Sequence, residues 1–554
     1  MDNFTTPGVY VQERQGLSLG IQSGQTAVPV FVGHFDPVQN TEGAGCVRVD
    51  SWQEFVARFS ADAQTTFCIN AAKGAPTRTG THVGALSVRL FFENGGGPCY
   101  VLALNTFSEK ALAAASEAIE LCPEITLLCW CEHRKADEDK KVIAMLSNLT
   151  GVGQQGSMRS RFLLVDAVLG EDGKVVVPQV AGGAHAAAYF PALSTGYRYV
   201  QEIEAVKIEV SEPIKKGLGQ GKDLTTIKAL REACEKAREA LAASANTVRT
   251  GLEALEPVLT QAGAKDSAHL LAPVQAAKLA FEQAVVAEAA TAHLKEVFSE
   301  LKNAPYTVDV FKDGTALTTL QTVDKALEAY VVARDGLLEG EKLQEAVRAQ
   351  ALRPVVLRAS VAMAGVYART DRERGVWKAP ANVELSGVQA LVSVRDTGVH
   401  EIRVDEHLNE TLVAAKVNAI RAFSGRGVVV WGSRTMAAAQ DLAWRYVPVR
   451  RLFDMVERDV QQALRSVVFE PNSQPTWEQV RGAVAGYLHR LWEDGALVGD
   501  TPAQAYFVHV GLGVTMSSED VQLGKMVIKV GLAAVRPAEF IVLQLTQDMV
   551  GAMA

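Results

Sequence analysis

The stretch SVRLFFENGGGPCYVLAL, residues 87–104, holds the change of pattern that decides the fold. Its first part is typical of a helix that ends at Gly95-Gly96-Gly97-Pro98, because glycine tolerates the backbone beyond a helix end and proline cannot continue the helix. The residues that follow, 99–104, form a short apolar run typical of a buried strand. A helix directly followed by a strand predicts a layered α/β structure.

The segments on either side of this stretch continue the alternation. We expect a buried strand at 27–35 and a helix at 51–59, where Ser51 and Glu54 stand at capping-box spacing. The remaining predictions in this part are a helix at 109–121 and strands at 125–131, 161–168 and 185–193. Strands that alternate with helices favour the α/β class, here a mixed α/β and α+β chain of several domains.

The composition changes near residue 210, and the following part predicts long helices. Apolar residues recur every three or four positions from Leu224 to Leu259 and again from Leu270 to Leu301. Such seams pack one helix against another, so we expect an antiparallel helical hairpin. A third helix is predicted at 322–351, and we interpret 205–352 as a mostly helical insertion.

Strands and helices alternate again after Arg353-Pro354. The predictions are a strand at 426–435, long helices at 444–469 and 475–497, and late strands at 505–512, 525–534 and 539–546. The predicted domains are an N-terminal arm at 1–25, an α/β domain at 26–204 plus 353–415, the insertion at 205–352, and a C-terminal domain at 416–554 that ends in a strand arm.

The composition limits the function classes. A formal net charge of −8 over 554 residues argues against a general nucleic-acid coat, whose surface should be basic. The sequence contains no apolar run long enough to span a bilayer and no N-terminal signal pattern, so we expect synthesis and folding in the cytoplasm. Seven scattered cysteines, an odd number in a large chain, favour buried reduced thiols over a disulfide framework.

A search for catalytic, metal and cofactor motifs gives no convincing site. GLGQGKD, residues 217–223, departs from the P-loop spacing and has Asp223 where the magnesium-binding hydroxyl belongs. Cys129, Cys131 and His133 share one face of a predicted strand, but no fourth zinc ligand is visible and burial explains them better. We therefore predict no catalytic residue, no metal site and no cofactor.

One charged segment, GVYARTDRERGVWKAPAN at 365–382, is suited either to a catalytic site or to a docking surface. Its charges lack a convergent acid, base or nucleophile, and alternating charges are often a solvated loop with local ion pairs. We predict a loop, anchored by the segment's tryptophan. The residues of this predicted signature loop are Arg369, Asp371, Arg372, Glu373, Arg374 and Trp377.

The same segment resembles the signature of contractile tail sheath proteins, which occur in phage tails, tailocins and related injection systems. The resemblance extends, in order, to TTPGVYVQE (5–13), AVPVFVG (27–33), LFFENGGGPCYVL (90–102), VNAIRAFSGRGVVVWGSRTM (417–436), YVPVRRLFDMVERDV (446–460), VFEPN (468–472), LWEDGALVG (491–499) and RPAEFIVLQL (536–545). The set covers most of the chain outside 205–352. That region carries no sheath signature, and Ser433 replaces the usual alanine.

The resemblance implies a structural subunit of a sheath of stacked hexameric rings around an inner tube. Its metastable extended form contracts after a signal from a baseplate and drives the tube through a target envelope. In such sheaths, terminal arms add strands to the sheets of neighbouring subunits. Here those arms map to about Pro7–Leu19 and Glu539–Thr546, with Gly16, Gly20 and Gly24 as a flexible link. The strand-addition candidates are Val9, Tyr10, Val11, Phe540, Ile541, Val542 and Leu543.

The resemblance also implies partners and a location. The expected partners are further copies of this chain or related sheath subunits, an inner tube protein, and baseplate and cap proteins, without nucleic acid or membrane insertion. Assembly is expected in the bacterial cytoplasm, into a phage tail or an injection particle. Candidate contacts to the tube or a neighbouring subunit are Arg450, Arg451, Asp454, Glu457, Arg458 and Asp459, on one long helix, and 205–352 is expected to face outward.

Two other functions remain as alternatives. One is a nucleotide-binding enzyme that uses Lys222 or the Arg369–Arg374 cluster, and the other is a coiled-coil adaptor built on the helices at 224–301.

Overall fold

The structure is a computed structural model that divides into two compact units. It describes residues 20–38, 45–61, 66–68, 77–79, 82–133, 136–152, 158–170, 172–199, 207–210, 212–218, 224–261, short pieces between 272 and 282, 315–395 and 398–539. The first unit contains Met1–Ala61, His82–Tyr197 and Val355–Ala554, and the second contains Asp62–Thr81 and Arg198–Pro354. Within the described residues, no helix is both long enough and apolar enough to span a bilayer.

An eight-stranded sheet lies at the centre of the first unit's described residues, in the order β19-β18-β12-β9-β6-β1-β5-β2. The six strands from β18 to β5 run parallel to one another, and β19 and β2 pair antiparallel at the two edges. The strands are β1 Pro29–Gly33, β2 Val47–Val49, β5 Cys99–Ala103, β6 Leu127–Trp130, β9 Phe162–Asp166, β12 Ala186–Phe190, β18 Val417–Phe423 and β19 Gly427–Trp431. The mixed α/β class predicted from the sequence is confirmed.

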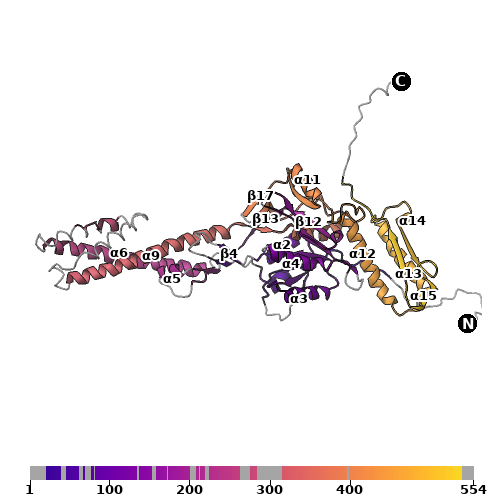
Figure 1. Ribbon diagram of the computed structural model, residues 1–554, viewed down its shortest axis with the longest axis horizontal. Coiled ribbons are helices and arrows are strands. Elements are labelled where there is room, and N and C mark those ends of the chain that lie inside the picture. Colours follow the sequence, from indigo (N-terminus) through magenta and orange to yellow (C-terminus); the bar gives the residue numbers. More distant parts are fainter. Residues whose placement is uncertain are drawn as a thin grey trace, which may run out of the picture. The chain divides into compact units, whose positions relative to one another are not determined.

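Helices cover both faces of this sheet (Figure 1). Side chains alternate between faces along a strand, so Val30 and Val32 pack into a core with α3 Glu109–Glu120 and α4 Ala136–Ser147. Phe31, between them, points the other way and meets Phe91 of α2 Gly84–Glu93 at 5.0 Å between ring centroids. Helix α10, Ala359–Arg374, packs beside α2 on that second face.

The early predictions agree with these elements to within a few residues. The predicted helix at 51–59 is α1 Trp52–Arg58, where the Ser51 hydroxyl accepts from the Glu54 N–H and the Glu54 carboxylate accepts from Asp50. This differs from a standard capping box, because the Glu54 side chain reaches the residue before the N-cap. Gly95, with φ of 92°, ends α2 before β5, as the opening stretch predicts.

A second, smaller sheet of the first unit has the order β15-β13-β16-β17. Its strands are β13 Ala192–Arg198, β15 Pro354–Leu357, β16 Val388–Arg395 and β17 Gly398–Glu401. The short strands β7 Gly151–Val152, β8 Met158–Arg159, β10 Val168–Leu169 and β11 Val175–Val176 form two further antiparallel pairs. Helix α11, Glu406–Ala414, covers part of the α3 and α4 face through Leu412.

The C-terminal part consists of two long helices and one β-hairpin. Helices α12 Val447–Leu464 and α13 Gln474–Glu493 share a core with β20 Tyr506–Val510 and β21 Ile528–Leu532. Two short helices, α14 Pro502–Ala505 and α15 Ser518–Gln522, lie in the connections. The predicted helices and the strands at 505–512 and 525–534 are confirmed, and the strand predicted at 539–546 lies almost wholly outside the described residues.

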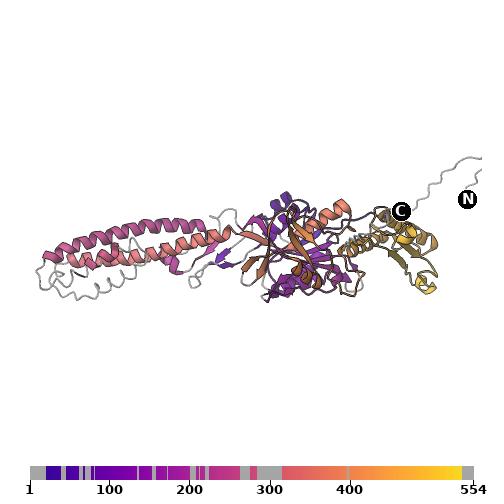
Figure 2. The ribbon, with the colours of Figure 1, turned by 90° about the horizontal axis from the view of Figure 1, so that it is seen from above.

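The second unit is built on two long helices, α6 Ile227–Gln261 and α9 Thr315–Ala351, which lie side by side in both views (Figures 1 and 2). Leu230, Cys234 and Leu252 of the predicted seam are buried. The helix predicted at 322–351 is confirmed and starts earlier, whereas most of the seam at 270–301 lies outside the described residues. A Cβ on Gly251 would come within 2.2 Å of Val323, so glycine permits this close approach. Helix α5 Glu212–Gly217 and strands β3 Thr66–Cys68, β4 Thr77–Thr79 and β14 Lys207–Glu209 complete the unit.

Candidate functional site

Helix α10 carries the charged segment that the sequence predicted to be a loop, and that prediction was wrong. Arg369, Asp371, Arg372, Glu373 and Arg374 lie in its last two turns. The helix starts in an apolar run that is completely buried, and this burial holds the following charged residues in helical register.

The helix ends at Gly375, whose φ is 86° and whose N–H donates to the carbonyl of Asp371. A Cβ at this position would lie 2.4 Å from the ring of Trp377. Both the backbone conformation and the close approach of the ring therefore favour glycine. Trp377 lies partly buried beside the C-terminal core, and its role as an anchor of this segment stays a prediction.

Asp371 is the buried member of this charged segment, while Arg372, Glu373 and Arg374 are exposed. Its carboxylate accepts two hydrogen bonds from Arg451 of α12, at 2.9 and 2.5 Å, and one from the Thr26 hydroxyl at 2.5 Å. Arg451 also donates to the Thr26 carbonyl at 3.0 Å. One ion pair therefore connects the segment before β1, the end of α10 and the start of α12.

Two tyrosines extend this network into the sheet. The Arg451 guanidinium lies 4.6 Å from the centroid of the Tyr367 ring, and the hydroxyls of Tyr367 and Tyr189 are 2.7 Å apart. Burial alone would lower the pKa of Arg451, but Asp371 more than compensates and holds that pKa above its usual value. Burial raises the pKa of both tyrosines, so they remain neutral hydrogen-bonding groups.

The charged residues of α12 are mostly internal, and their role as contacts to a tube or neighbour stays a prediction. Arg450, Arg451, Asp454 and Asp459 are at most 5 % exposed, whereas Glu457 and Arg458 are partly exposed. Arg450 donates to Asp454 one turn later at 3.0 Å, and its guanidinium lies 4.1 Å from the centroid of the Trp444 ring. Residues four positions apart lie on the same face of a helix, so the opposite charges of Arg450 and Asp454 can pair. This pairing offsets part of the free-energy cost of burying the two charges.

The segment before β1 is docked onto the C-terminal helices. Ile21 is 3 % exposed within their core, and its carbonyl accepts from Arg490 at 2.7 Å. The Gly24 N–H donates to Asp459 at 3.3 Å, and a Cβ there would lie 3.1 Å from the same carboxylate. Gly24 is therefore a docking point, whereas the sequence predicted a flexible link. Gly16 lies outside the described residues, as do the strand-addition candidates Val9, Tyr10 and Val11.

The other end of the described chain is also held. The Glu539 carboxylate accepts two hydrogen bonds from Arg434, at 2.7 and 2.8 Å, and one from the Tyr446 hydroxyl at 3.0 Å. The candidates Phe540, Ile541, Val542 and Leu543 follow immediately and lie outside the described residues. Both predicted arms therefore begin beside fixed points at the two ends of the described chain, Ile21–Thr26 and Glu539.

Strands β20 and β21 form a two-stranded hairpin whose strands pair only with each other in the described part of the chain. Two isolated bridges lie nearby among the described residues: Leu497 pairs with Ala534, beyond the end of β21, and Leu512 pairs with Met516, in the connection after β20. Such a hairpin has backbone donors and acceptors at its outer edges that can receive an added strand. Phe507 of β20 is about half exposed beside one edge.

The sheet resembles a nucleotide-binding arrangement, but its usual anion site is filled from within. Strand β1 lies between β5 and β6, so the order reverses at β1, where open α/β sheets bind ligands at a helix N-terminus. Here the buried Glu132 carboxylate accepts from the N–H groups of His34, Val83 and Gly84, at 3.0 to 3.3 Å. A Cβ on Gly84 would lie 2.7 Å from the carbonyl of His34. This carboxylate occupies the place that a phosphate would need.

The other chemical motifs also lack a reactive arrangement. Cys129 and Cys131 are completely buried, and burial raises the pKa of both thiols. Among the described residues, no group of three or more His, Cys, Asp and Glu side chains is placed to hold a metal ion. Lys222 and most of GLGQGKD lie outside the described residues.

Comparison with known proteins agrees with the resemblance seen in the sequence. Residues 439–547 match the phage tail sheath C-terminal domain family. A tail sheath protein of Vibrio phage KVP40 is 26 % identical over 137 residues, which are 24 % of this chain and 19 % of that protein. A tail sheath protein of Burkholderia phage BcepMu is 28 % identical over 156 residues, 28 % of this chain and 31 % of that protein. The chain thus aligns with less than a third of the length of either relative.

Solved structures match the chain over nearly its whole length. The helical sheath of the anti-feeding prophage in its contracted state is 29 % identical, with a TM-score of 0.58, and the match covers 98 % of this chain and 100 % of that one. The contracted PVC sheath complex, from an extracellular contractile injection system, is 25 % identical, with a TM-score of 0.53 and 99 % of each chain covered. A chain of the anti-feeding prophage baseplate structure is 29 % identical, with a TM-score of 0.57, covering 99 % of this chain and 100 % of that one.

The sequence match and the structural likeness both point to contractile sheath proteins as the class that this chain resembles. This chain is similar to contractile tail sheath proteins, in sequence over parts of its length and in structure over nearly all of it. Its homologues are sheath proteins of phage tails and of extracellular contractile injection systems.

Proposed function

We propose that this chain is the structural subunit of a contractile sheath, which polymerises around an inner tube and contracts to drive that tube through a target envelope. The observation that carries the proposal is the match of nearly the whole chain to a helical sheath in its contracted state. The subunit would use no cofactor and no catalytic residue. Energy would be stored in the packing of the extended sheath and released when the interfaces change between discrete arrangements.

The fixed points at the two chain ends suit this function. An arm that adds a strand to a neighbour's sheet must transmit force to its own subunit, so its base has to be held. The Ile21 and Gly24 contacts would hold the N-terminal arm, and the Arg434–Glu539 pair the C-terminal arm. Strand addition by 7–19 and 540–546 would then connect subunits while the bodies between them rotate.

The proposed partners are further copies of this chain in stacked hexameric rings, an inner tube protein, and baseplate and cap proteins. The match to a chain in a baseplate structure supports the baseplate contact. Assembly would take place in the bacterial cytoplasm, before the particle is completed as a phage tail or an injection system. The exposed charges of α10, Arg372 and Arg374, remain candidates for subunit contacts.

A truncation tests the arm assignment. The full chain and a variant without residues 1–20 would be purified and imaged by negative-stain electron microscopy. We expect tubes or rings from the full chain and a folded monomer from the truncation, because Ile21 and Gly24 stay in place. Normal sheaths from the truncated chain would exclude the N-terminal arm as a connector.

The second unit requires a separate test. Replacing 210–350 with a short Gly-Ser linker should preserve assembly if this region decorates the outer surface. A soluble, folded product that forms no polymer would assign the region to assembly instead.

Calorimetry with ATP and GTP addresses the enzyme alternative. The Glu132 carboxylate at the N-terminus of α2 predicts no binding. The size of the purified particle under native conditions separates a sheath subunit from a coiled-coil adaptor, because a sheath subunit forms rings or tubes.

A further inference from the structure

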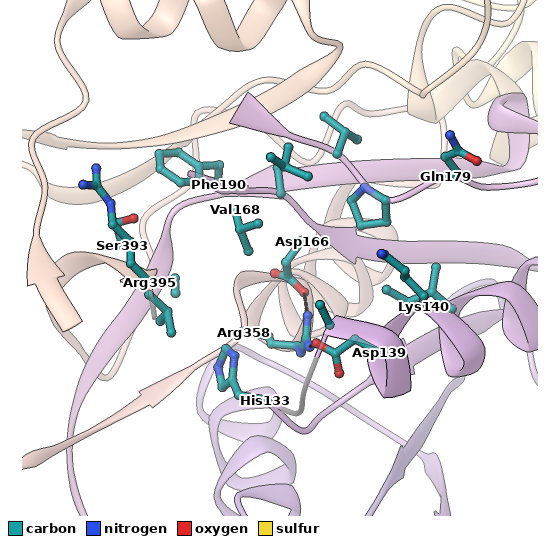
Figure 3. A pocket seen from close by; sticks show the side chains of 18 of the residues that line it. His133, Asp139, Lys140, Asp166, Val168, Gln179, Phe190, Arg358, Ser393 and Arg395 are labelled. Carbon is teal, nitrogen blue, oxygen red and sulfur yellow. Dashed lines mark hydrogen bonds and ion pairs between the residues drawn. The ribbon is translucent and has the colours of Figure 1, made fainter. Parts of the chain in front are cut away.

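A cavity of about 750 Å³ opens at one edge of the central sheet (Figure 3). Asp166 ends β9, Phe190 ends β12, and His133 follows β6 by three residues, so the cavity lies at the carboxyl ends of three parallel strands. Open α/β sheets bind their ligands at this edge. The volume falls within the range of small-molecule sites, roughly 300–1,000 Å³.

The walls of this cavity come from several elements and are largely apolar. Helix α4 contributes one side, strands β10 and β11 a second, and β16 a third. The apolar side chains of the lining include Ile143, Val168, Val176, Phe190 and Val392. The cavity is therefore suited to an apolar molecular body, with polar groups placed at a few points.

Three polar atoms of the lining have no hydrogen-bond partner within the described part of the chain. They are the Ser393 hydroxyl, Nε2 of His133 and Nε of Arg395. Ser393 is only 3 % exposed, and buried polar side chains are nearly always hydrogen-bonded. Figure 3 shows Ser393 beside Arg395, and His133 beside Arg358. Burial, assisted by the charge of Arg358, lowers the pKa of His133 to about 3, so its ring is neutral.

The other charged groups of the cavity already have ion-pair partners. Arg358 donates to Asp139 at 2.5 Å and lies 3.6 Å from Asp166, which also accepts from the Ser360 hydroxyl at 2.6 Å. The lining contains three cationic side chains (Lys140, Arg358 and Arg395) and two carboxylates (Asp139 and Asp166). Lys140 lies 3.8 Å from Asp137, outside the lining, so in the described part of the chain Arg395 is the cation of the lining without an ion pair, and its Nε has no hydrogen-bond partner.

We propose that this cavity binds a small molecule with an apolar body and a single anionic head, such as an alkyl or aryl carboxylate or sulfonate. The body packs between Val168, Val176 and Phe190. The head accepts hydrogen bonds from Arg395 and Ser393, and the neutral His133 ring supplies a further polar contact. This site is separate from the chain ends, and the binding does not depend on the proposed sheath function.

The test uses the full chain and the fluorescent anion 8-anilinonaphthalene-1-sulfonate. We expect saturable binding with one site per chain, displaced by octanoate but not by octanol. Arg395→Gln should weaken the affinity for this anion by about tenfold, the effect of one charge-assisted hydrogen bond. The same variant should bind the uncharged N-phenyl-1-naphthylamine almost unchanged. Val176→Trp, at a half-exposed lining position, should weaken both probes because it fills the cavity.

Arg403→Gln is the matched control, because Arg403 is an exposed arginine outside the lining. Circular dichroism would verify that each variant is folded, and Val176→Trp keeps the test valid should Arg395→Gln fail to fold. A cavity that holds only water would give no saturable fluorescence, and this result would overturn the proposal. Saturable binding that neither lining variant weakens would do the same. A chain that forms sheaths but fails this test would leave the proposed function intact.

Discussion

Arg451 of α12 and Asp371 of α10 form a two-point ion pair, with nitrogen–oxygen distances of 2.9 and 2.5 Å, and their side chains are 3 % and 6 % exposed. Because Thr26 contacts both residues, the pair connects three segments that lie far apart in the sequence. The pair lies inside the subunit, so its role is to fix the relative position of α10, α12 and the segment before β1.

Removing one partner of this pair should destabilise the subunit strongly. Arg451→Met leaves the Asp371 carboxylate buried without its cation, and such a change costs about 3–5 kcal/mol. The double variant Arg451→Met/Asp371→Leu should lose less than the sum of the two single variants, because no charge is left buried alone. Urea unfolding of the truncation without residues 1–20, which we expect to stay monomeric, would measure these free energies.

The exposed charges of the same helix provide the control. Arg372→Ala should change the free energy of unfolding by less than about 0.5 kcal/mol, as is usual for surface positions. If the exposed end of α10 contacts another subunit, Arg372→Ala should instead reduce the amount of sheath that forms. Equal destabilisation by Arg372→Ala and Arg451→Met would contradict the distinction between a buried and an exposed charge.

The sequence predicted the local elements well and the partners of the charged residues poorly. The capped helix at Ser51 and the seam around Leu230 depend on neighbours in the sequence, and both predictions agree with the structure. Asp371 and Arg451 alternate with other charges in a way that is typical of exposed residues. Their burial depends on Thr26, hundreds of residues away, and no local pattern contains that information. One available signal was the apolar run before Arg369, which is long enough for a buried helix.

Gly365 allows α10 to lie close to α2, and its substitution should show this. A Cβ at Gly365 would lie 2.5 Å from the carbonyl oxygen of Phe91 and 2.9 Å from Asn94, and the first of these is backbone. Gly365→Ala should therefore destabilise the subunit by about 1–3 kcal/mol, as overpacked cores do. Thermal unfolding would record the shift.

Gly482 is the matched control for this change. It lies on an exposed face of α13, and nothing is within 4 Å of its would-be Cβ. Gly482→Ala should stabilise by about 0.5–1 kcal/mol, because alanine loses less backbone entropy in a helix. We therefore expect Gly365→Ala to lower the free energy of unfolding and Gly482→Ala to raise it. If both substitutions lowered it, the close approach at Gly365 would not explain the difference between the two sites.

His133 should make the subunit less stable in acid. Its folded pKa of about 3 lies below the ordinary value of 6.5, so the unfolded chain binds the proton first as the pH falls. Stability contributed by the neutral ring is complete above about pH 6.5 and is lost as the pH falls towards 3. His133→Asn has no proton to gain and should lose less stability between pH 6.5 and 4.

The comparison of slopes isolates this histidine. Asp166 lies near it, and burial raises the pKa of Asp166 despite Arg358, but that contribution is common to both proteins and cancels. Chemical unfolding at several pH values would give the two curves. Parallel curves would show that the ring takes up its proton as readily in the folded chain as in the unfolded one, which contradicts the lowered pKa.

Phe469 is a candidate contact that the sequence did not reveal. It follows α12, is fully exposed and has a φ of 75°, a conformation that costs energy for a bulky residue. Phe469→Gly relieves this strain, so the monomer should be at least as stable as the parent. Electron microscopy should nevertheless show fewer or shorter sheaths if the ring packs against another subunit. Val468→Ala, at the exposed neighbouring position, is the control.

Glu539 should matter for assembly far more than for folding. Its carboxylate accepts from Arg434 and Tyr446 at the point where the predicted C-terminal arm begins. The pair is partly exposed, so Glu539→Ala should change the free energy of unfolding by about 0–1 kcal/mol. An arm that is no longer held at its base loses its orientation. Its strand must then be ordered at the moment of binding, so it binds the neighbour's sheet more weakly.

Sedimentation of polymers tests this effect. It should show a higher critical concentration for Glu539→Ala than for Glu519→Ala, which removes an exposed carboxylate on α15. Equal critical concentrations would mean that the Arg434–Glu539 pair does not hold the arm.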